Sequence, residues 1–306
     1  MKKAVVIGGS GFIGLYTVEQ LLSEGNSVTI IDSAYNKVVN NIINTHGSHK
    51  IKHVIGSAND IFLLEKYFRN VDYVYYLAAN TCPLDNNWPF YYQSNVNAVL
   101  NVLQTAKNSE VKKVLLASSS AVYGNNTSSP NREDIIPEPI SPYGITKLIA
   151  EYYFKIYNDF HNLPTISLRY FNVYGPRQNP NSPFASVIPK FIKNISIGQS
   201  PVIFGDGEQK RDFVFVKDVA QANVLAASSD ATGIYNIGFG KSTSINDLCQ
   251  LLFKLMHTNA IKPMYQADKA GGIKNSLADI TRAKAFGYAP IYDLESGLRE
   301  TIEGFK

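Results

Sequence analysis

Two side chains four positions apart could together move a proton. Tyr143 and Lys147 occur in the segment Ser-Pro-Tyr-Gly-Ile-Thr-Lys, and on a helix this spacing places both on one face. Pro142 favours the first turn of a helix. A tyrosine that acts as a base near neutral pH must have its pKa lowered from ~10 to about 7, which requires roughly 4 kcal/mol of differential stabilisation. A lysine ammonium at ~4 Å supplies about that energy at an effective dielectric constant of 20.

The same spacing also occurs by chance in surface pairs, because the chain has 19 tyrosines. A group of hydroxyl residues upstream strengthens the catalytic interpretation. Ser118, Ser119 and Ser120 follow the apolar run 114–116, and open α/β sheets bind ligands at the carboxyl ends of their strands. A serine there can bridge a substrate hydroxyl and the tyrosine oxygen. The alternative is a serine that only caps a turn.

A glycine-rich turn near the N-terminus predicts a dinucleotide site. Gly8, Gly11 and Gly14 follow the first apolar run, and such a turn lets the backbone approach a pyrophosphate at a helix N-terminus. Asp32 lies 18 residues after Gly14, where a carboxylate can bind both hydroxyls of a ribose and repel a 2′-phosphate. This pattern favours NAD over NADP, although Lys37 leaves NADP open.

Apolar runs alternate with amphipathic stretches through the first half of the chain, which predicts a doubly wound parallel sheet of the Rossmann type with helices on both faces. After about residue 168, Gly and Pro recur at short intervals and predict a smaller C-terminal α/β lobe. We expect a cofactor domain over 1–170 with a return segment near 211–238, whose strand around Phe213 rejoins the first sheet, and a substrate lobe over 171–306. The predicted strands are 4–7, 27–31, 71–77, 114–116 and 165–168, and the predicted helices are 12–23, 61–68, 95–107 and 143–160.

The composition argues against several classes of function. The 306 residues include 29 Lys and Arg against 25 Asp and Glu, a net charge of +4, which makes nucleic acid or an anionic membrane a poor partner. No stretch of 18 consecutive apolar residues occurs, so no membrane span is expected. Cys82 and Cys249 lie far apart and offer neither a zinc-ligand spacing nor a disulfide framework. We therefore expect no metal and a cytoplasmic location.

Seven motifs occur in one order along the chain: IGGSGFIG, LAA, SSSAVYG, SPYGITKLIAE, LRYFNVYGPRQ, GDGEQKRDFVFVKDVA and YNIG. With them the chain resembles, from Lys3 to about Thr301, the extended short-chain dehydrogenase/reductases of the NAD-dependent sugar-nucleotide epimerase/dehydratase family. Members of this family bind NAD in the first domain and a nucleotide sugar in the second.

The resemblance implies a role for each matching residue. Ser119, with Ser120 as the less favoured neighbour, falls on the catalytic hydroxyl position. Tyr143 would be the general base and acid, Lys147 would lower its pKa and hold the nicotinamide ribose, and Arg211 would bind the nucleotide phosphates. The implied NAD-binding residues are Gly8, Gly11, Phe12, Ile13, Gly14, Asp32, Ser57, Ala58, Leu77, Ala78, Ala79, Asn95, Tyr143, Lys147 and Tyr170, and the implied substrate-binding residues are Ser119, Ser120, Asn172, Arg211, Lys269 and Ser276.

Departures from the family pattern narrow the reaction. Dehydratases of the family carry an Asp-Glu pair where Ser120 and Ala121 stand, and its decarboxylating members carry a glutamate at the second position. Neither acid is present. The remaining chemistry is a reversible hydride transfer, which predicts 4-epimerisation of a UDP-hexose or UDP-N-acetylhexosamine.

Three more positions bear on the substrate. Lys269 stands where similar proteins use an arginine to bind the diphosphate, and Gly272 stands where they carry an acid. These two departures leave open whether the nucleotide is UDP. Ser276 falls where similar epimerases carry a gate residue, and its small side chain predicts that N-acetylated sugars are accepted.

The same residues are also compatible with two other functions. A nucleotide-linked keto-sugar reductase with net turnover of NAD(H) would use the same Ser, Tyr and Lys, and a regulatory nucleotide sensor could use the same fold. The aromatic-rich predicted helix 143–160 also exceeds the needs of one core face. In similar proteins such helices form the seam of a homodimer, so a homodimer is expected.

Overall fold

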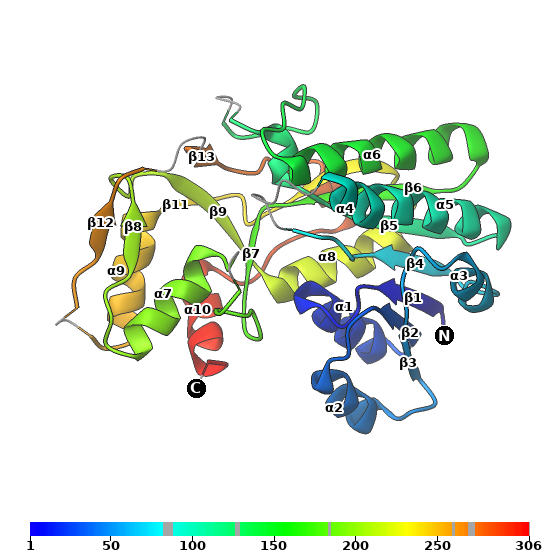
Figure 1. Cartoon of the computed structure of the whole chain (residues 1–306), viewed down its shortest axis with the longest axis horizontal. Helices are drawn as coiled ribbons and strands as arrows, with labels where there is room; N and C mark the ends of the chain where they lie inside the picture. The colour runs from blue at the N-terminus through cyan, green and yellow to red at the C-terminus, as the bar shows by residue number, and fades with distance from the viewer. Residues whose placement is uncertain (82–87, 126–128, 183–184, 259–260, 269–272, 306) are drawn as a thin grey trace.

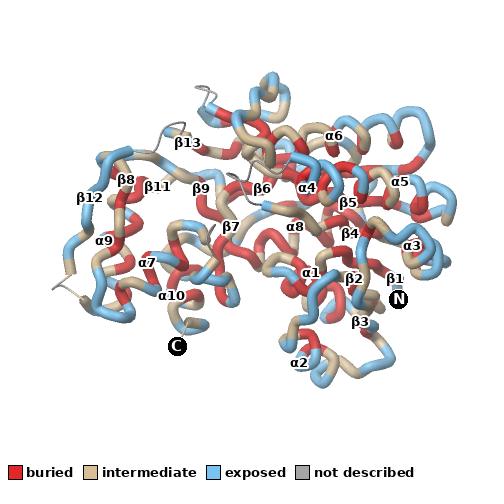
Figure 2. Tube along the Cα trace, viewed as in Figure 1, coloured by how far each residue is buried: buried red, intermediate tan, exposed pale blue. Residues whose placement is uncertain are grey.

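A computed structural model describes residues 1–81, 88–125, 129–182, 185–258, 261–268 and 273–305. Figure 1 shows its two parts, a sheet covered by helices around the N-terminus and a smaller part that holds the C-terminus. Buried residues concentrate along the strands of the first part, as the tube in Figure 2 shows.

Seven parallel strands form the first sheet, in the spatial order β10-β6-β5-β4-β1-β2-β3. The chain runs outward from β1 through β2 to β3 and then returns to the other side of β1 with β4, so the topological switch point lies between β1 and β4. Ligands bind at such a point in open α/β sheets. The strand bounds are β1 Lys3–Ile7, β2 Ser27–Asp32, β3 Ile51–Ile55, β4 Tyr73–Tyr76, β5 Lys113–Ser119, β6 Thr165–Tyr170 and β10 Gly233–Ile237.

Helices cover both faces of this sheet, as its all-parallel pairing requires. One face packs against α1 (Phe12–Ser23), α2 (Lys37–His46) and α8 (Val216–Ser228). The other packs against α3 (Ile61–Tyr67), α5 (Ala98–Asn108) and α6 (Pro142–His161). A short α4 (Trp88–Tyr92) and a π-helical segment η1 (Gln93–Asn97) lead into α5, and a 3₁₀ turn η2 (Ser120–Tyr123) follows β5. The predicted fold class is confirmed.

Three elements of the first half were not predicted: the short helix α4, the helix α2 and the strand β3. α2 is rich in asparagine, with only Val39 and Ile42 buried, so its apolar face is short. Its cap, Asn36, accepts a hydrogen bond from the amide of Val38 (3.0 Å), and is a start signal that the sequence does contain. β3 lies at the edge of the sheet and has only Ile51 fully buried, which removes the apolar run expected of a central strand.

The strand around Phe213 was predicted wrongly. Within the described residues, β9 (Lys210–Phe215) pairs with β7 (Asn172–Tyr174), β11 (Ser242–Ser244) and β13 (Asn275–Ser276). The strand that joins the first sheet beside β6 is β10. The reason is connectivity, since α8 carries the chain from β9 across to the first sheet before β10 begins. The division near residue 170 remains a prediction.

The C-terminal part is more helical than the frequent Gly and Pro residues suggested. α7, α9 and α10 share one apolar core with β9, and β8 forms a two-stranded sheet with β12. The bounds are β7 Asn172–Tyr174, α7 Val187–Ser196, β8 Val202–Phe204, β11 Ser242–Ser244, α9 Ile245–Leu255, β12 Met264–Gln266, β13 Asn275–Ser276, η3 Ala283–Phe286 and α10 Leu294–Glu303.

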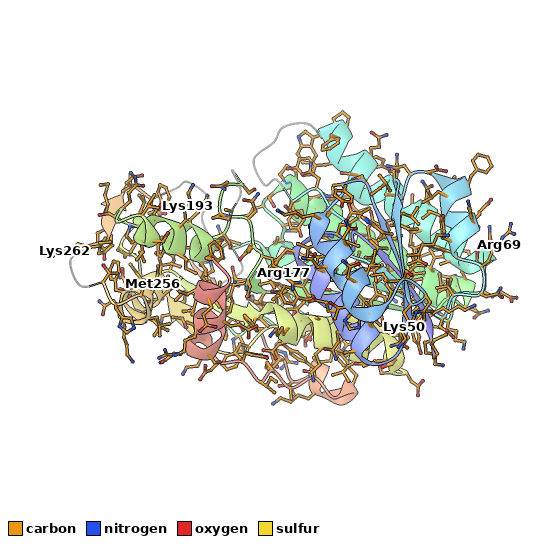
Figure 3. All side chains as sticks on the ribbon, turned by 90° about the horizontal axis from the view of Figure 1, so that it is seen from below. Lys50, Arg69, Arg177, Lys193, Met256 and Lys262 are labelled. Carbon is orange, nitrogen blue, oxygen red and sulfur yellow. The ribbon has the colours of Figure 1, made fainter. Side chains whose placement is uncertain are left out.

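Arg177 ties the two parts together. Its guanidinium donates two 3.0 Å hydrogen bonds to Glu19 of α1 and lies 4.8 Å from the ring centre of Tyr16, whose hydroxyl donates to the carbonyl of Pro176 (3.1 Å). Figure 3 places Arg177 near the middle of the molecule, with Lys193 and Lys262 toward one end. In the part of the chain that the structure describes, no helix is long and apolar enough to cross a membrane.

Candidate active site

The glycine turn between β1 and α1 is closed by backbone contacts that leave no room for side chains. A Cβ on Gly14 would lie 2.2 Å from the carbonyl oxygen of Gly8, and one on Gly8, whose φ is +80°, would lie 2.6 Å from the amide nitrogen of Ala78. Gly11 caps the N-terminus of α1 without a side-chain hydrogen bond. The free amides of this helix start therefore remain available to an anion.

Asp32 lies at the end of β2 beside this turn. Its carboxylate accepts hydrogen bonds from the amides of Ser10 (3.0 Å) and Ala34 (3.1 Å). A cavity of about 440 Å³ extends from this carboxylate past the glycine turn to the end of β4. Its size is in the range of small-ligand sites, and a glycine turn with a carboxylate at the next strand end is the arrangement that binds dinucleotides. Of the predicted cofactor residues it contains Gly8, Gly11, Asp32, Ser57, Ala58, Leu77, Ala78 and Ala79.

Asn95 shapes the backbone at the far end of this cavity. Its buried amide accepts from the backbone nitrogen of Asn80 (2.8 Å) and donates to the carbonyl of the same residue (3.0 Å). It also donates to the hydroxyl of Thr146 on α6 (3.1 Å). Asn95 therefore connects the segment after β4 to the helix that carries Tyr143. Two further predicted cofactor residues, Phe12 and Ile13, lie in the first turn of α1 and pack against the cluster that contains Tyr16.

Ser119 and Tyr143 meet where β5 ends and α6 begins. The Ser119 side chain accepts a hydrogen bond from the amide of Ala121 (3.1 Å), and it lies near enough to the Tyr143 hydroxyl to lower the pKa of that phenol. Ser141 caps α6 by accepting from the amide of Gly144 (3.1 Å), so the tyrosine stands in the first turn, as predicted. Ser120 begins the 3₁₀ turn directly beside this pair.

Lys147 is buried one turn further along α6, but its ammonium does not contact the Tyr143 hydroxyl. Its Nζ donates to the carbonyl of Ala117 (2.6 Å) and lies 5.8 Å from the centre of the Tyr143 ring. Burial lowers the pKa of Lys147 to about 8, opposed by the negative charge of Glu151.

Lys147 was expected to lower the pKa of Tyr143, but the side chains around Tyr143 do not produce this effect. Burial raises the pKa of Tyr143 to about 12, and the hydrogen bond from Ser119 only partly opposes it. The physical reason is that the Lys147 ammonium is turned to the Ala117 carbonyl. A further positive charge near the phenol is needed to bring its pKa toward neutrality.

Tyr170 was expected to face the nicotinamide, but its hydroxyl points elsewhere. It donates to Asn223 of α8 (2.6 Å), and Asn223 in turn donates to Thr17 of α1 (3.0 Å). Burial raises the pKa of Tyr170 well above its usual value. The hydroxyl is therefore bound within the core, near Tyr143, and the contact of Tyr170 with the nicotinamide remains a prediction.

A second cavity, of about 280 Å³, lies on the C-terminal side and contains two predicted substrate residues, Asn172 and Arg211. The Asn172 amide donates to the backbone carbonyl of Asp212 (3.0 Å). The Arg211 guanidinium donates to the carbonyls of Lys210 (2.8 Å) and Lys274 (3.3 Å), and burial lowers its pKa. Apolar walls from Phe204, Val187 and Ile203 suit a flat nucleobase.

Ser276 lies beside Arg211 in the paired strands β13 and β9, and it is buried. The next residue along β9, Asp212, holds this arrangement: its carboxylate accepts from the amides of Phe239 (2.7 Å), Gly240 (3.0 Å) and Ala278 (3.0 Å). Burial raises the pKa of Asp212 to about 6 despite these donors. Lys269 and Gly272 lie outside the described residues.

Replacement of Asp212 by asparagine is expected to lower the free energy of unfolding at neutral pH by about 1–3 kcal/mol, because an amide nitrogen would face a buried N–H donor. Affinity for the nucleotide should fall as well. The matched control is Asp218→Asn on α8, since Asp218 is also buried and accepts from the amides of Ile291 (3.0 Å) and Tyr292 (3.2 Å), away from Arg211. Urea unfolding and UDP titration calorimetry measure both effects. Equal loss of UDP affinity in the two variants would contradict the assigned role.

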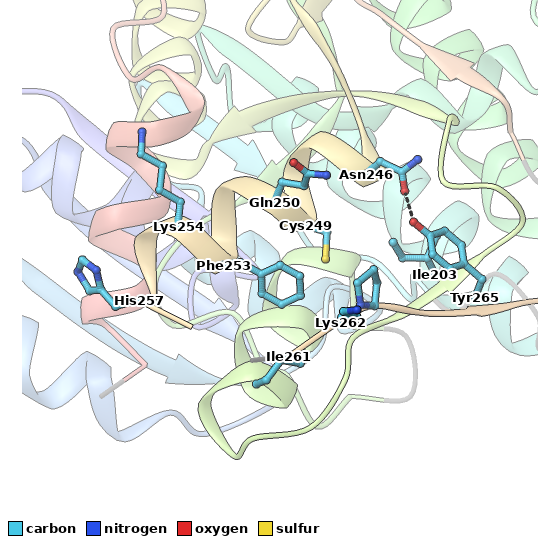
Figure 4. A pocket seen from close by; sticks show the side chains of 11 residues that line it. Ile203, Asn246, Cys249, Gln250, Phe253, Lys254, His257, Ile261, Lys262 and Tyr265 are labelled. Carbon is cyan, nitrogen blue, oxygen red and sulfur yellow. Dashed lines mark hydrogen bonds between the residues drawn. The ribbon is translucent and has the colours of Figure 1, made fainter. Parts of the chain in front are cut away.

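A cavity of about 590 Å³, larger than the two described above, lies elsewhere, between α9 and β12 (Figure 4). Phe253 and Ile261 line it, and the Tyr265 hydroxyl hydrogen-bonds Asn246 at its end (3.0 Å). Its described lining includes none of the predicted site residues, so size alone does not identify the site.

Three buried charged residues near the site were not predicted: Glu151, Arg169 and Asp212. Glu151 lies four positions after Lys147, the same spacing that separates Lys147 from Tyr143, so extending the helical pattern by one turn would have found it. Arg169 and Asp212 occur within the motifs LRYFN and KRDFV. Their burial could not be read from sequence, because charged residues are seldom fully buried.

A family profile described as "NAD dependent epimerase/dehydratase family" matches residues 4–238. A UDP-N-acetylglucosamine 4-epimerase from Methanobrevibacter ruminantium M1, solved in complex with UDP-N-acetylmuramic acid, is similar over 99% of this chain and 98% of that chain, with a TM-score of 0.94 and 42% identity. A putative UDP-glucose 4-epimerase of Methanocaldococcus jannaschii is 35% identical over 306 residues, which cover 99% of this chain and 98% of the relative. The UDP-glucose 4-epimerase of Thermus thermophilus, solved with NAD, has a TM-score of 0.87 and 29% identity over 99% of this chain and 98% of that chain.

Proposed function

Since this chain belongs to the NAD-dependent epimerase/dehydratase family, we propose that it interconverts the two C4 epimers of a UDP-sugar and that UDP-N-acetylglucosamine is among its substrates. The observation that carries the proposal is the proximity of Ser119 to the Tyr143 hydroxyl at the carboxyl end of β5, with Lys147 buried beside them.

The proposed chemistry assigns one proton path to these residues. The Tyr143 oxygen takes the proton of the sugar C4 hydroxyl through or beside Ser119, and it returns the proton after the keto sugar has turned. Bound NAD supplies the acceptor and then the donor of the C4 hydride. Lys147 adds a fixed positive charge near the phenol and a donor for a ribose hydroxyl. No net oxidation results, because the hydride and the proton both return to the sugar.

Elimination of water in this family uses an acidic pair directly after the catalytic hydroxyl, and this sequence does not carry that pair. Ser120 and Ala121 occupy the positions after Ser119, and neither is a carboxylic acid. The Glu151 carboxylate is buried in contact with Arg169 and does not supply one. Reversible transfer of hydride at C4 is therefore the favoured reaction.

For the substrate we propose that the second cavity holds the uridine and that Arg211 and Asn172 contact the diphosphate. A guanidinium suits this task because it forms two parallel hydrogen bonds to phosphate oxygens. The similar Methanobrevibacter enzyme, named for UDP-N-acetylglucosamine, supports an N-acetylated sugar, as does the small side chain of Ser276 on the neighbouring strand.

A cofactor-free assay tests the proposal. The purified protein is incubated with UDP-N-acetylglucosamine and no added nicotinamide, and the anomeric proton signals are followed. Interconversion of the gluco and galacto forms without a net change in nicotinamide absorbance is expected. Turnover that requires stoichiometric nicotinamide would instead identify a keto-sugar reductase.

Replacement of Ser276 by tyrosine is expected to lower kcat/KM for UDP-N-acetylglucosamine by about 10- to 100-fold, because a filled pocket excludes the acetamido group at a cost of about 1–3 kcal/mol. Activity toward UDP-glucose should change far less. The ratio of the two kcat/KM values is the measurement. A Ser276→Tyr protein that kept full activity on the N-acetylated sugar would refute the assignment, and Ser276→Ala is the control for loss of the hydroxyl alone.

We also propose that the enzyme acts in the cytoplasm as a homodimer joined through α6. Tyr152, Ile156 and Phe160 recur at four-residue spacing on this helix and are 56%, 43% and 78% exposed, which forms an apolar stripe that a second copy could cover. Replacement of Ile156 by glutamate is expected to shift the protein to the monomer in sedimentation analysis, whereas Lys155→Glu beside it should not.

A further inference from the structure

Glu151 is a charged side chain enclosed within the fold. It is 2% exposed and lies on the face of α6 that carries Tyr143 and Lys147, because the three residues recur at intervals of four. A buried carboxylate is costly unless it is paired and hydrogen-bonded. Its partners therefore show which groups it holds in place.

Two partners bind this carboxylate from neighbouring strands. Arg169 of β6, itself 1% exposed, donates from Nε to Oε1 (2.9 Å) and from Nη2 to Oε2 (2.7 Å). Ser118 of β5 donates to Oε1 (2.5 Å). The Arg169 guanidinium also lies 4.7 Å from the ring centre of Tyr123. A buried ion pair adds little net stability compared with an apolar pair. Stability therefore does not explain why the fold contains the Glu151–Arg169 pair.

The position of these bonds relative to the reacting groups suggests another role. Ser118 directly precedes Ser119, and Ala117, one residue earlier, accepts a hydrogen bond from Lys147. Consecutive residues of β5 are therefore held to α6 by Lys147 and Glu151. The strand end that carries Ser119 and the helix that carries Tyr143 cannot shift relative to each other without breaking one of these bonds.

The negative charge of Glu151 also acts on Lys147. The charged or titratable groups that face Lys147 and Glu151 are Tyr143 on α6, Arg169 on β6 and Tyr123 on η2. Neither tyrosine is charged at neutral pH and Arg169 is positive, so among these described groups the negative charge comes from Glu151, which favours the charged form of the lysine. We propose that Glu151, paired with Arg169, is a positioning residue for the Ser119–Tyr143–Lys147 site: it fixes the end of β5 against α6 and keeps Lys147 protonated. This proposal rests on the proposed roles of those three residues.

The first test measures the Lys147 ammonium without using activity. In protein labelled with ¹⁵N-lysine, the signal missing from Lys147→Arg identifies Lys147, and its titration is followed by NMR. Glu151→Gln is expected to move the midpoint from near pH 8 to a pH lower by about one unit, because an opposite charge at this range shifts a pKa by about that amount or more. Asp159→Asn, which removes an exposed carboxylate from the same helix, should leave the midpoint unchanged. An unchanged midpoint in Glu151→Gln would show that Glu151 does not keep Lys147 protonated, whichever reaction the enzyme catalyses.

The second test separates position from charge by kinetics. Ser118→Ala keeps the carboxylate but loses its bond to β5, so kcat should fall about 10-fold while the alkaline limb of the pH profile and KM stay unchanged. Glu151→Gln should move the alkaline limb toward lower pH.

Because Glu151→Gln leaves Arg169 buried without its ion-pair partner and could fail to fold, the double variant Glu151→Leu/Arg169→Met provides a folded control without buried charge. If folded Ser118→Ala and the double variant both retain the wild-type kcat and pH profile, the proposal is wrong and the pair is structural. If instead the proposed function is wrong, the wild-type protein itself will show no interconversion, so the two failures can be distinguished.

Discussion

Replacement of Tyr143 by phenylalanine is expected to lower kcat by about 10³-fold, within the range known for loss of a general acid-base, with little change in KM. The ring would keep its packing, and only the oxygen that meets Ser119 would be lost. Proton transfer from the sugar hydroxyl then has no acceptor at this position. Anomeric proton NMR gives the rate, and thermal unfolding confirms that the variant folds.

Tyr152→Phe is the matched control, because Tyr152 lies on the same helix with its side chain exposed and should retain full activity. If Tyr143→Phe kept more than about a tenth of the wild-type kcat, Tyr143 would not be the group that moves the proton.

Replacement of Gly14 by alanine is expected to abolish NAD retention and lower the free energy of unfolding by several kcal/mol. The new Cβ would lie 2.2 Å from the Gly8 carbonyl oxygen and 2.7 Å from the Gly9 Cα, and backbone atoms cannot give way as a flexible side chain can. The start of α1 would move off the glycine turn, so its amides would no longer face a pyrophosphate. Bound nicotinamide in the purified protein and urea unfolding are the measurements.

Gly25→Ala, just beyond the other end of α1, is the control. Gly25 also has a positive φ (+80°), but a Cβ there meets nothing within 4 Å. The expected cost is only the backbone strain of about 1–2 kcal/mol, with NAD retained. Equal NAD loss in both variants would show that general destabilisation, and not the turn, is responsible.

Local patterns in the sequence predicted the parts of the molecule that depend on neighbours along the chain. The turn at Gly8 to Gly14 and the helix start at Pro142 both follow from short segments whose conformation is set locally. The strand predicted over 114–116 was also found, but it continues to Ser119. The alternation of strands and helices then predicted a parallel sheet with the candidate site at the carboxyl ends of its strands. These features agree with the structure because local propensity and tertiary packing favour the same conformation.

Features that depend on distant partners were predicted less well. The hydroxyl of Tyr170 points to Asn223, which is 53 residues away in sequence, and the position of β9 depends on the path of α8. The pKa of Tyr143 depends on the direction of the Lys147 ammonium, which a helical spacing does not define. The role proposed for Glu151 likewise requires Arg169 and Ser118 to meet it from two other strands.

The late return of β10 to the first sheet has a consequence for synthesis on the ribosome. Until residue 228 has emerged, α1 lacks the packing of the complete α8 against it, and until residue 237 has emerged, β6 has no β10 beside it. The nascent cofactor domain therefore exposes a strand edge and an apolar helix face while the C-terminal part is being made, a state that favours chaperone binding or aggregation. Translation pauses between residues 170 and 237 would prolong that state, whereas pauses after residue 237 would not.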